Sequence, residues 1–127
     1  MMYKYDNVFL PGWINVEQIK VLYDNSYFML APYKNYKDFE LSIPNKIYDA
    51  LSNGLPILTP LHGEVKQLID KYEVGIHYKN EKDLCLKFYK ILSNDKIRDN
   101  MSINAKRLFN KNYNFDLVYN KFLEIMD

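Results

Sequence analysis

The fold is decided by the stretch Leu41–Pro60, LSIPNKIYDALSNGLPILTP. Pro44 suits the first turn of a helix, where a missing N–H leaves no hydrogen bond unmade. An apolar stripe at helical spacing follows, made by Ile47, Ala50 and Leu51. Asn53 and Gly54 predict the end of that helix, because both residues tolerate left-handed backbone. The apolar run Leu55–Leu58 then predicts a short strand covered on both faces.

The start of this helix is a candidate phosphate-binding position. Lys46 lies in its first turn and Asp49 in its second. Helix N-termini favour negative charge, and a carboxylate such as Asp49 can accept hydrogen bonds from both hydroxyls of a ribose. The alternative is a solvated pair of Lys46 and Asp49 that contributes about 0.3 kcal/mol. Taken by themselves, the residues favour this second interpretation.

The composition describes a single globular domain. The chain has 127 residues, of which 48% are hydrophobic, and a formal net charge of +1. This near-neutral, scattered charge excludes a general polyanion binder, so no nucleic-acid partner is expected. The sequence has neither an apolar run of roughly 20 residues nor a secretory signal pattern, so a cytoplasmic location is expected. The single cysteine, Cys85, excludes an internal disulfide and is expected to be a packed thiol.

Strand and helix patterns alternate along the chain. Strands are expected at Val8–Leu10, Tyr27–Ala31, Leu55–Leu58 and Gly75–Tyr78. Helices are expected at Val16–Asp24, from Pro44 to Ser52, from Gly63 or Glu64 onward, and at Glu81–Leu92, Asp95–Asn110 and Phe115–Met126, with Lys34–Glu40 as a polar loop. The alternation predicts an α/β fold, a Rossmann-like parallel sheet of about four strands with flanking helices.

Sheets of this kind bind ligands beyond the carboxyl ends of their strands, so a functional site is expected in the loops there. After the strand Leu55–Leu58, the next helix opens with His62, Gly63 and Glu64. Gly63 allows close approach of the backbone to a ligand, and Glu64 suits the helix dipole. A capped helix start with an exposed histidine is the alternative. No metal-ligand spacing is present, so no metal is expected.

Trp13, beside Gly12, lies in an earlier loop of the same kind. It is interpreted either as an exposed loop aromatic or as an anchor at the edge of the core, and the second is favoured.

Six blocks in a fixed order carry a family resemblance: FLPGWI (Phe9–Ile14), IKVLYDNSYFMLAPY (Ile19–Tyr33), SIPNKIYDALSNGLPILT (Ser42–Thr59), HGEVKQLI (His62–Ile69), VGIHY (Val74–Tyr78) and MSINAKRLF (Met101–Phe109). Over nearly its whole length the chain resembles the C-terminal, donor-binding domain of GT-B glycosyltransferases of the retaining, family-4-like kind, the glycosyl transferases group 1. The third block is the most specific.

The resemblance implies roles for particular residues. The family carries two acidic residues eight positions apart, of which the second contacts the ribose of the nucleotide sugar. Asp49 occupies that second place, whereas the first falls on Leu41, with Glu40 one residue away. The turn that faces the donor diphosphate corresponds to Ser42, Pro44, Asn45 and Lys46. The loop that flanks the nucleobase corresponds to Gly12, Trp13 and Ile14, and the loop near the donor to His62, Gly63 and Glu64.

The resemblance also implies that part of the domain is missing. In the usual strand order 3-2-1-4-5-6, Val8–Leu10 would be strand 3 and Tyr27–Ala31 would be strand 4. Strands 1 and 2, with the basic loop that clamps the diphosphate, have no counterpart here. Two outcomes are expected: either Val8–Leu10 pairs directly with Tyr27–Ala31, or the sheet keeps an open edge that needs another polypeptide.

The functional expectation is a partial donor-binding domain over residues 1–127, ending in helices over 95–126, within an enzyme that transfers a sugar from a nucleotide-sugar donor. The acceptor would be a glycan or lipid-linked acceptor in bacterial surface polysaccharide or lipopolysaccharide synthesis, with the full enzyme at the inner face of the membrane. No cofactor or metal is implied, no catalytic base is expected in this chain, and the N-terminal half or another chain would be a partner. The alternatives are a non-catalytic Rossmann-like or flavodoxin-like binding module, and another GT-B enzyme such as a sugar-nucleotide epimerase.

Overall fold

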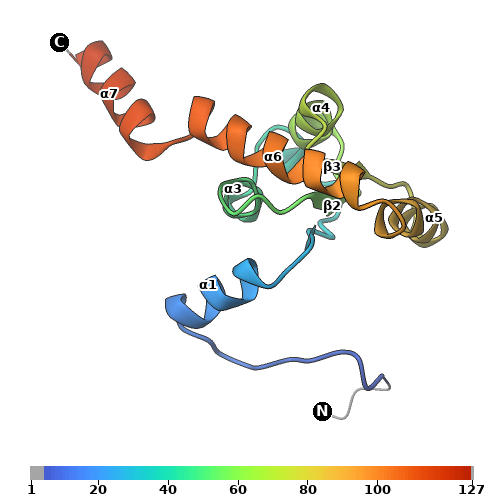
Figure 1. Cartoon of the computed structure of the whole chain (residues 1–127). Coiled ribbons are helices and arrows are strands. Elements are labelled where there is room, and N and C mark those ends of the chain that lie inside the picture. The colour runs from blue at the N-terminus through green and yellow to red at the C-terminus, as the bar shows by residue number, and fades with distance from the viewer. Residues whose placement is uncertain (1–4, 127) are drawn as a thin grey trace.

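A parallel three-stranded sheet organises the protein. The computed structural model describes residues 5–126. The strands are β1 (Met29–Leu30), β2 (Ile57–Thr59) and β3 (Gly75–His77), in the order β1-β2-β3. Met29 lies opposite Ile57, which lies opposite Gly75 on the other side. With helices between the strands, this arrangement confirms the predicted Rossmann-like α/β class (Figure 1).

Two helices cover one face of the sheet. They are α3 (Asn45–Ser52) and α4 (Gly63–Tyr72), which connect β1 to β2 and β2 to β3. Each buries the apolar stripe that its sequence predicts: Ile47, Ala50 and Leu51 on α3, and Val65, Leu68 and Ile69 on α4. These side chains form the main core with Ile57 and Val74. Helix α3 ends at Asn53 and Gly54, where Gly54 has a φ of +66°, as its stop signal predicts.

The opposite face is covered by α5 (Glu81–Leu92). Its Ile91 packs against Leu58 and Ile76, whose side chains point away from the main core because they alternate with Ile57 and Gly75 along their strands. The long helix α6 (Asp95–Asn112) then crosses from α5 to the C-terminal ends of α3 and α4.

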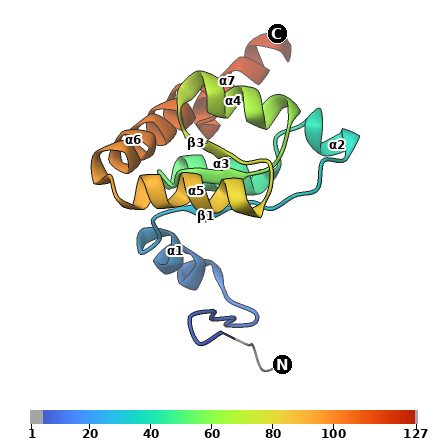
Figure 2. The same cartoon turned by 90° about the vertical axis from the view of Figure 1, so that its right-hand side faces the viewer.

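The N-terminal part of the chain departs from the prediction. Residues Val8–Leu10 form no strand and their side chains are exposed, so the predicted first strand is wrong. Helix α1 (Val16–Asp24) has the predicted bounds and begins with a capping box between Asn15 and Gln18. It has no buried residue, and only Tyr23 packs against the main core. Figure 2 shows α1 and the preceding segment lying below the body of the molecule.

The sheet therefore has an open edge at β1. Within residues 5–126, β1 pairs with β2 alone, through N–H donors of Met29 and Ala31 to Pro56 O (3.0 Å) and Leu58 O (2.8 Å). The strand is shorter than predicted, and Leu30 remains 49% exposed, because no second neighbour covers it. Of the two expected outcomes, the structure has the open edge.

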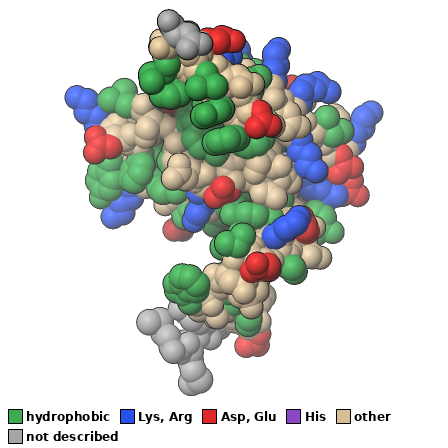
Figure 3. Space-filling model, turned by 90° about the vertical axis from the view of Figure 1, so that its left-hand side faces the viewer, with side chains coloured by type: hydrophobic (Ala, Val, Ile, Leu, Met, Phe, Trp, Pro, Cys, Tyr) green, Lys and Arg blue, Asp and Glu red, His purple; other side chains and the backbone are tan. Residues whose placement is uncertain are grey.

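Three smaller differences concern exposed segments. The predicted polar loop contains a short helix, α2 (Lys37–Glu40). Cys85 is exposed instead of packed, because it lies on the outer side of α5. The last helix, α7 (Phe115–Met126), has the predicted bounds but no buried residue. In Figure 3 hydrophobic side chains gather around this C-terminal end and beside the N-terminal segment.

Candidate functional site at the carboxyl edge of the sheet

The carboxyl ends of the strands carry most of the residues that the sequence singles out. In a parallel sheet the connecting helices begin at this edge, so the starts of α3 and α4 lie near each other. Two segments of the predicted site meet directly, because a Cβ added to Gly63 would lie 2.0 Å from the carbonyl oxygen of Glu40. The fold thus joins the segment that leads into α3 with the start of α4.

This contact changes the interpretation of Gly63. Its φ is +66°, and the backbone that approaches it is that of Glu40 in α2. The sequence predicted a close approach to a ligand, whereas in the structure the glycine makes room for the protein's own chain. Gly63 consequently shapes this edge by letting α2 pack against α4.

The start of α3 exposes polar groups. Pro44 is the N-cap residue and makes no side-chain cap hydrogen bond, so no cap side chain covers the first turn. Asn45 and Lys46 are exposed there. The hydroxyl of Ser42 donates to the carbonyl oxygen of Asp38 (2.7 Å), which ties the approach to α3 to the end of α2.

Asp49 lies on the second turn of α3 and is exposed. Among the ion pairs of the described residues, none joins Asp49 to Lys46, so the solvated pair is not formed here. The negative charge of Asp49 instead acts on Tyr23, in the last turn of α1. Burial, and then the charge of Asp49, raise the pKa of Tyr23 above its usual value. An exposed carboxylate with no cationic partner is a suitable acceptor for ligand hydroxyls.

The loop that follows β2 is held by hydrogen bonds from several elements. The buried hydroxyl of Thr59 donates to Ala31 O (2.7 Å) and accepts from Leu61 N–H (3.3 Å). The side chain of Asn35, in the loop after β1, donates to Pro60 O (2.9 Å) and accepts from His62 N–H (2.7 Å). Asn35 and Thr59 were missed by the sequence reasoning, although a polar residue at the end of a parallel strand is a signal that could have found them.

A pair of histidines borders the same loop. The rings of His62 and His77 lie 5.1 Å apart, and Nε2 of His77 lies 3.2 Å from Pro60 O. Burial lowers the pKa of His77 despite this carbonyl, and the nearby Lys66 and Lys87 lower it further. His77 thus links the end of β3 to the loop after β2. The described residues include no cluster of three or more His, Cys, Asp or Glu side chains suited to a metal ion.

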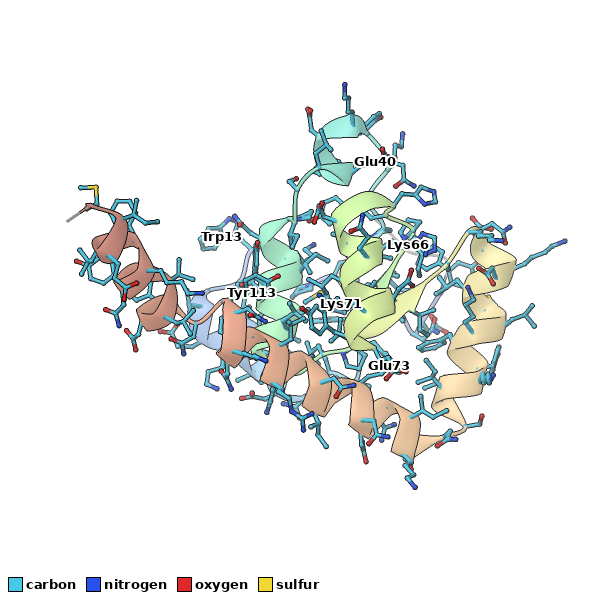
Figure 4. The ribbon with its side chains drawn as sticks, turned by 90° about the horizontal axis from the view of Figure 1, so that it is seen from above. Trp13, Glu40, Lys66, Lys71, Glu73 and Tyr113 are labelled. Carbon is cyan, nitrogen blue, oxygen red and sulfur yellow. The ribbon has the colours of Figure 1, made fainter. Side chains whose placement is uncertain are left out.

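The loop with Gly12, Trp13 and Ile14 lies apart from this edge. Trp13 is 95% exposed, so the favoured interpretation as an anchor at the edge of the core is wrong. Figure 4 shows Trp13 at a distance from Glu40 and Lys66, which belong to α2 and α4. Gly12 has a φ of +77° with nothing within 4 Å of a built Cβ. The N-terminal segment is thus not assembled with the rest of the predicted site.

The sheet order, the helix starts at its carboxyl edge and the ordered sequence blocks agree with one family. Residues 3–108 match the family model described as Glycosyl transferases group 1. The chain belongs to this family. Comparisons with curated proteins and with solved structures found no match. The matched region ends within α6, so α7 lies beyond it. None of the helices over residues 5–126 is long and apolar enough to cross a membrane.

Proposed function

We propose that this group 1 glycosyltransferase domain contributes half of a donor site, the part that holds the diphosphate and the ribose of a nucleotide sugar. The observation that carries the proposal is the start of α3, where the N–H groups of Asn45 and Lys46 have no side-chain cap and where Lys46 and the unpaired carboxylate of Asp49 lie within two turns of one helix. A nucleoside diphosphate offers a negative diphosphate to the helix start and ribose hydroxyls to a carboxylate.

The chemistry of the two ends differs. At the start of α3, Asn45 and Lys46 would face the diphosphate, with the helix end adding about half a positive charge. Ser42 and Pro44 would shape the turn that presents these groups, while Asp49 would accept hydrogen bonds from the ribose hydroxyls. On the other side of this edge, the side chains of Glu40, His62 and Glu64 would border the donor sugar. Gly63 brings these segments together, because it lets the backbone of Glu40 approach α4.

Transfer would rely on stabilising the leaving diphosphate. Positive side chains and helix ends stabilise the charge that develops on a departing diphosphate, and no metal ion is required for this effect. The open edge of β1 supports a second polypeptide, or the N-terminal half, as the source of the remaining donor groups and of the acceptor site. We further propose a glycan or lipid-linked acceptor, bacterial surface polysaccharide or lipopolysaccharide synthesis as the pathway, and a place at the inner face of the membrane.

The nucleobase would be held by the loop of Gly12, Trp13 and Ile14. The indole of Trp13 is almost fully exposed and offers a free face for stacking. Because this loop belongs to the segment that lies below the body of the molecule (Figure 2), its contribution requires the N-terminal segment to move toward the edge when the ligand binds.

Nucleotide binding by the 127-residue chain tests the proposal. We expect UDP, GDP, ADP or CDP to shift amide signals at the start of α3 in a ¹⁵N-correlated NMR titration. Asp49→Ala should weaken the binding about 10-fold, because hydrogen bonds to a charged group contribute roughly 1.5–3 kcal/mol. Asp116→Ala, which removes an exposed carboxylate from α7, is the matched control and should bind like the unaltered chain.

Equal affinity of the Asp49→Ala and Asp116→Ala variants would contradict the ribose role. A chain that ignores all four nucleotides and responds only to a flavin, or to Mg²⁺ with acetyl phosphate, would instead support a flavodoxin-like or response-regulator-like module.

A further inference from the structure

Asn35 joins two loops that are distant in the sequence. Its side-chain amide donates to Pro60 O (2.9 Å), 25 residues away, and its carbonyl oxygen accepts from His62 N–H (2.7 Å), 27 residues away. Both distances are those of well-formed hydrogen bonds. The Asn35 side chain thus bonds to both Pro60 and His62 in the segment between β2 and α4, and links this segment to the loop after β1.

Pro60 and its neighbours receive contacts from the loop after β1 and from strands β2 and β3. The loop after β1 supplies Asn35, β2 supplies the Thr59 hydroxyl to Leu61 N–H (3.3 Å), and β3 supplies His77 to Pro60 O (3.2 Å). Thr59 is fully buried and belongs to the core, whereas Asn35 is exposed. Among these three residues, Asn35 is therefore the one whose hydrogen bonds can be removed without opening a cavity.

We infer that Asn35 is a positioning residue for the donor site: it fixes the orientation of the Pro60–His62 backbone and hence the direction in which the first N–H groups of α4 point. The inference rests on the proposed function, because those groups matter only if a donor binds at this edge. His62 is the N-cap of α4 and makes no side-chain cap hydrogen bond, so its backbone position is set by the loop contacts. Only a side chain with both a donor and an acceptor can make the Asn35 bridge.

Because Asn35 is exposed, its role in positioning the loop can be distinguished from a role in global stability. Exposed hydrogen bonds contribute little to global stability, so Asn35→Ala should lower the melting temperature by no more than about 3 °C. Asn25→Ala is a matched control, because Asn25 is also exposed and its side chain donates to Val21 O within α1 (2.8 Å). The two variants should melt alike, and only Asn35→Ala should alter the edge of the sheet.

Two measurements on the full chain test the inference. In the ligand-free chain, Asn35→Ala should shift the NMR signals and speed the hydrogen exchange of the amides of residues 61–64, and Asn25→Ala should not. Asn35→Asp keeps the acceptor for His62 N–H and loses the donor for Pro60 O, so it should restore slow exchange at His62. With UDP, GDP, ADP and CDP as probes, Asn35→Ala should weaken whichever binds about 3- to 10-fold, as expected for lost hydrogen bonds.

Unchanged amides at 61–64, or equal nucleotide affinity in Asn35→Ala and the unaltered chain, would overturn the inference. A melting temperature lowered far beyond that of Asn25→Ala would also overturn it, since the residue would then stabilise the whole fold. If the unaltered chain binds none of the four nucleotides, the proposed function fails and the donor role of Asn35 fails with it. The chemical shifts and hydrogen exchange of residues 61–64 would then still show whether Asn35 positions this loop, independently of nucleotide binding.

Discussion

At the scale of single residues, Gly63 is the most constrained position near the candidate site. Its φ of +66° suits glycine, and an added Cβ would lie 2.0 Å from Glu40 O. We expect Gly63→Ala to lower the free energy of unfolding by about 2–4 kcal/mol, because left-handed strain and the clash with α2 add together. Gly12→Ala is the control: its φ is +77° with nothing within 4 Å, so it should lose about 1 kcal/mol or less. Urea unfolding measures both values, and equal losses would rule out the clash with Glu40.

At the scale of elements, α6 packs against both α3 and α4, the helices that cover one face of the sheet. Ala105 and Leu108 are buried against the core, and Asn104 reaches Glu73 O at the end of α4 (3.5 Å). Leu108→Ala should therefore lower the free energy of unfolding by about 2–4 kcal/mol, since a buried leucine leaves a cavity. Ile103→Ala, on the same helix but 54% exposed, should change it by less than about 0.5 kcal/mol in the same urea experiment. Similar effects of both substitutions would mean that α6 does not pack as described.

At the scale of the whole molecule, the apolar surface is concentrated at the two ends of the chain. Helix α7 buries no residue, and its Phe122 and Ile125 are 54% and 84% exposed. A chain that ends at Asn114 should keep its melting temperature within about 2 °C and bind less of a hydrophobic dye, because only exposed surface is removed. Phe122→Gln in the full chain should also reduce dye binding without changing the melting temperature. A truncated chain that fails to fold would show that α7 supports the core.

Local signals in the sequence determined the helices and strands around the core. The ordered sequence blocks indicated the family. Pro44, the apolar stripe of α3 and the stop at Gly54 act over a few residues, so helix α3 and the approach to β2 could be predicted from the sequence. The helical pattern likewise predicted the bounds of α1, which Asn15 caps in the structure. The roles of Asp49 and its neighbours in ligand binding remain predictions that the nucleotide titration decides.

Only the tertiary structure decided which of these segments pair and what brings the edge together. The apolar run Val8–Leu10 has the pattern of a strand, but a strand needs a neighbour for its backbone groups, and no segment among residues 5–126 provides one. The bridge from Asn35 to the loop after β2 and the approach of Gly63 to Glu40 each join residues more than 20 positions apart. Contacts of this range depend on how the helices pack on the sheet, and a local pattern of residue types does not encode them.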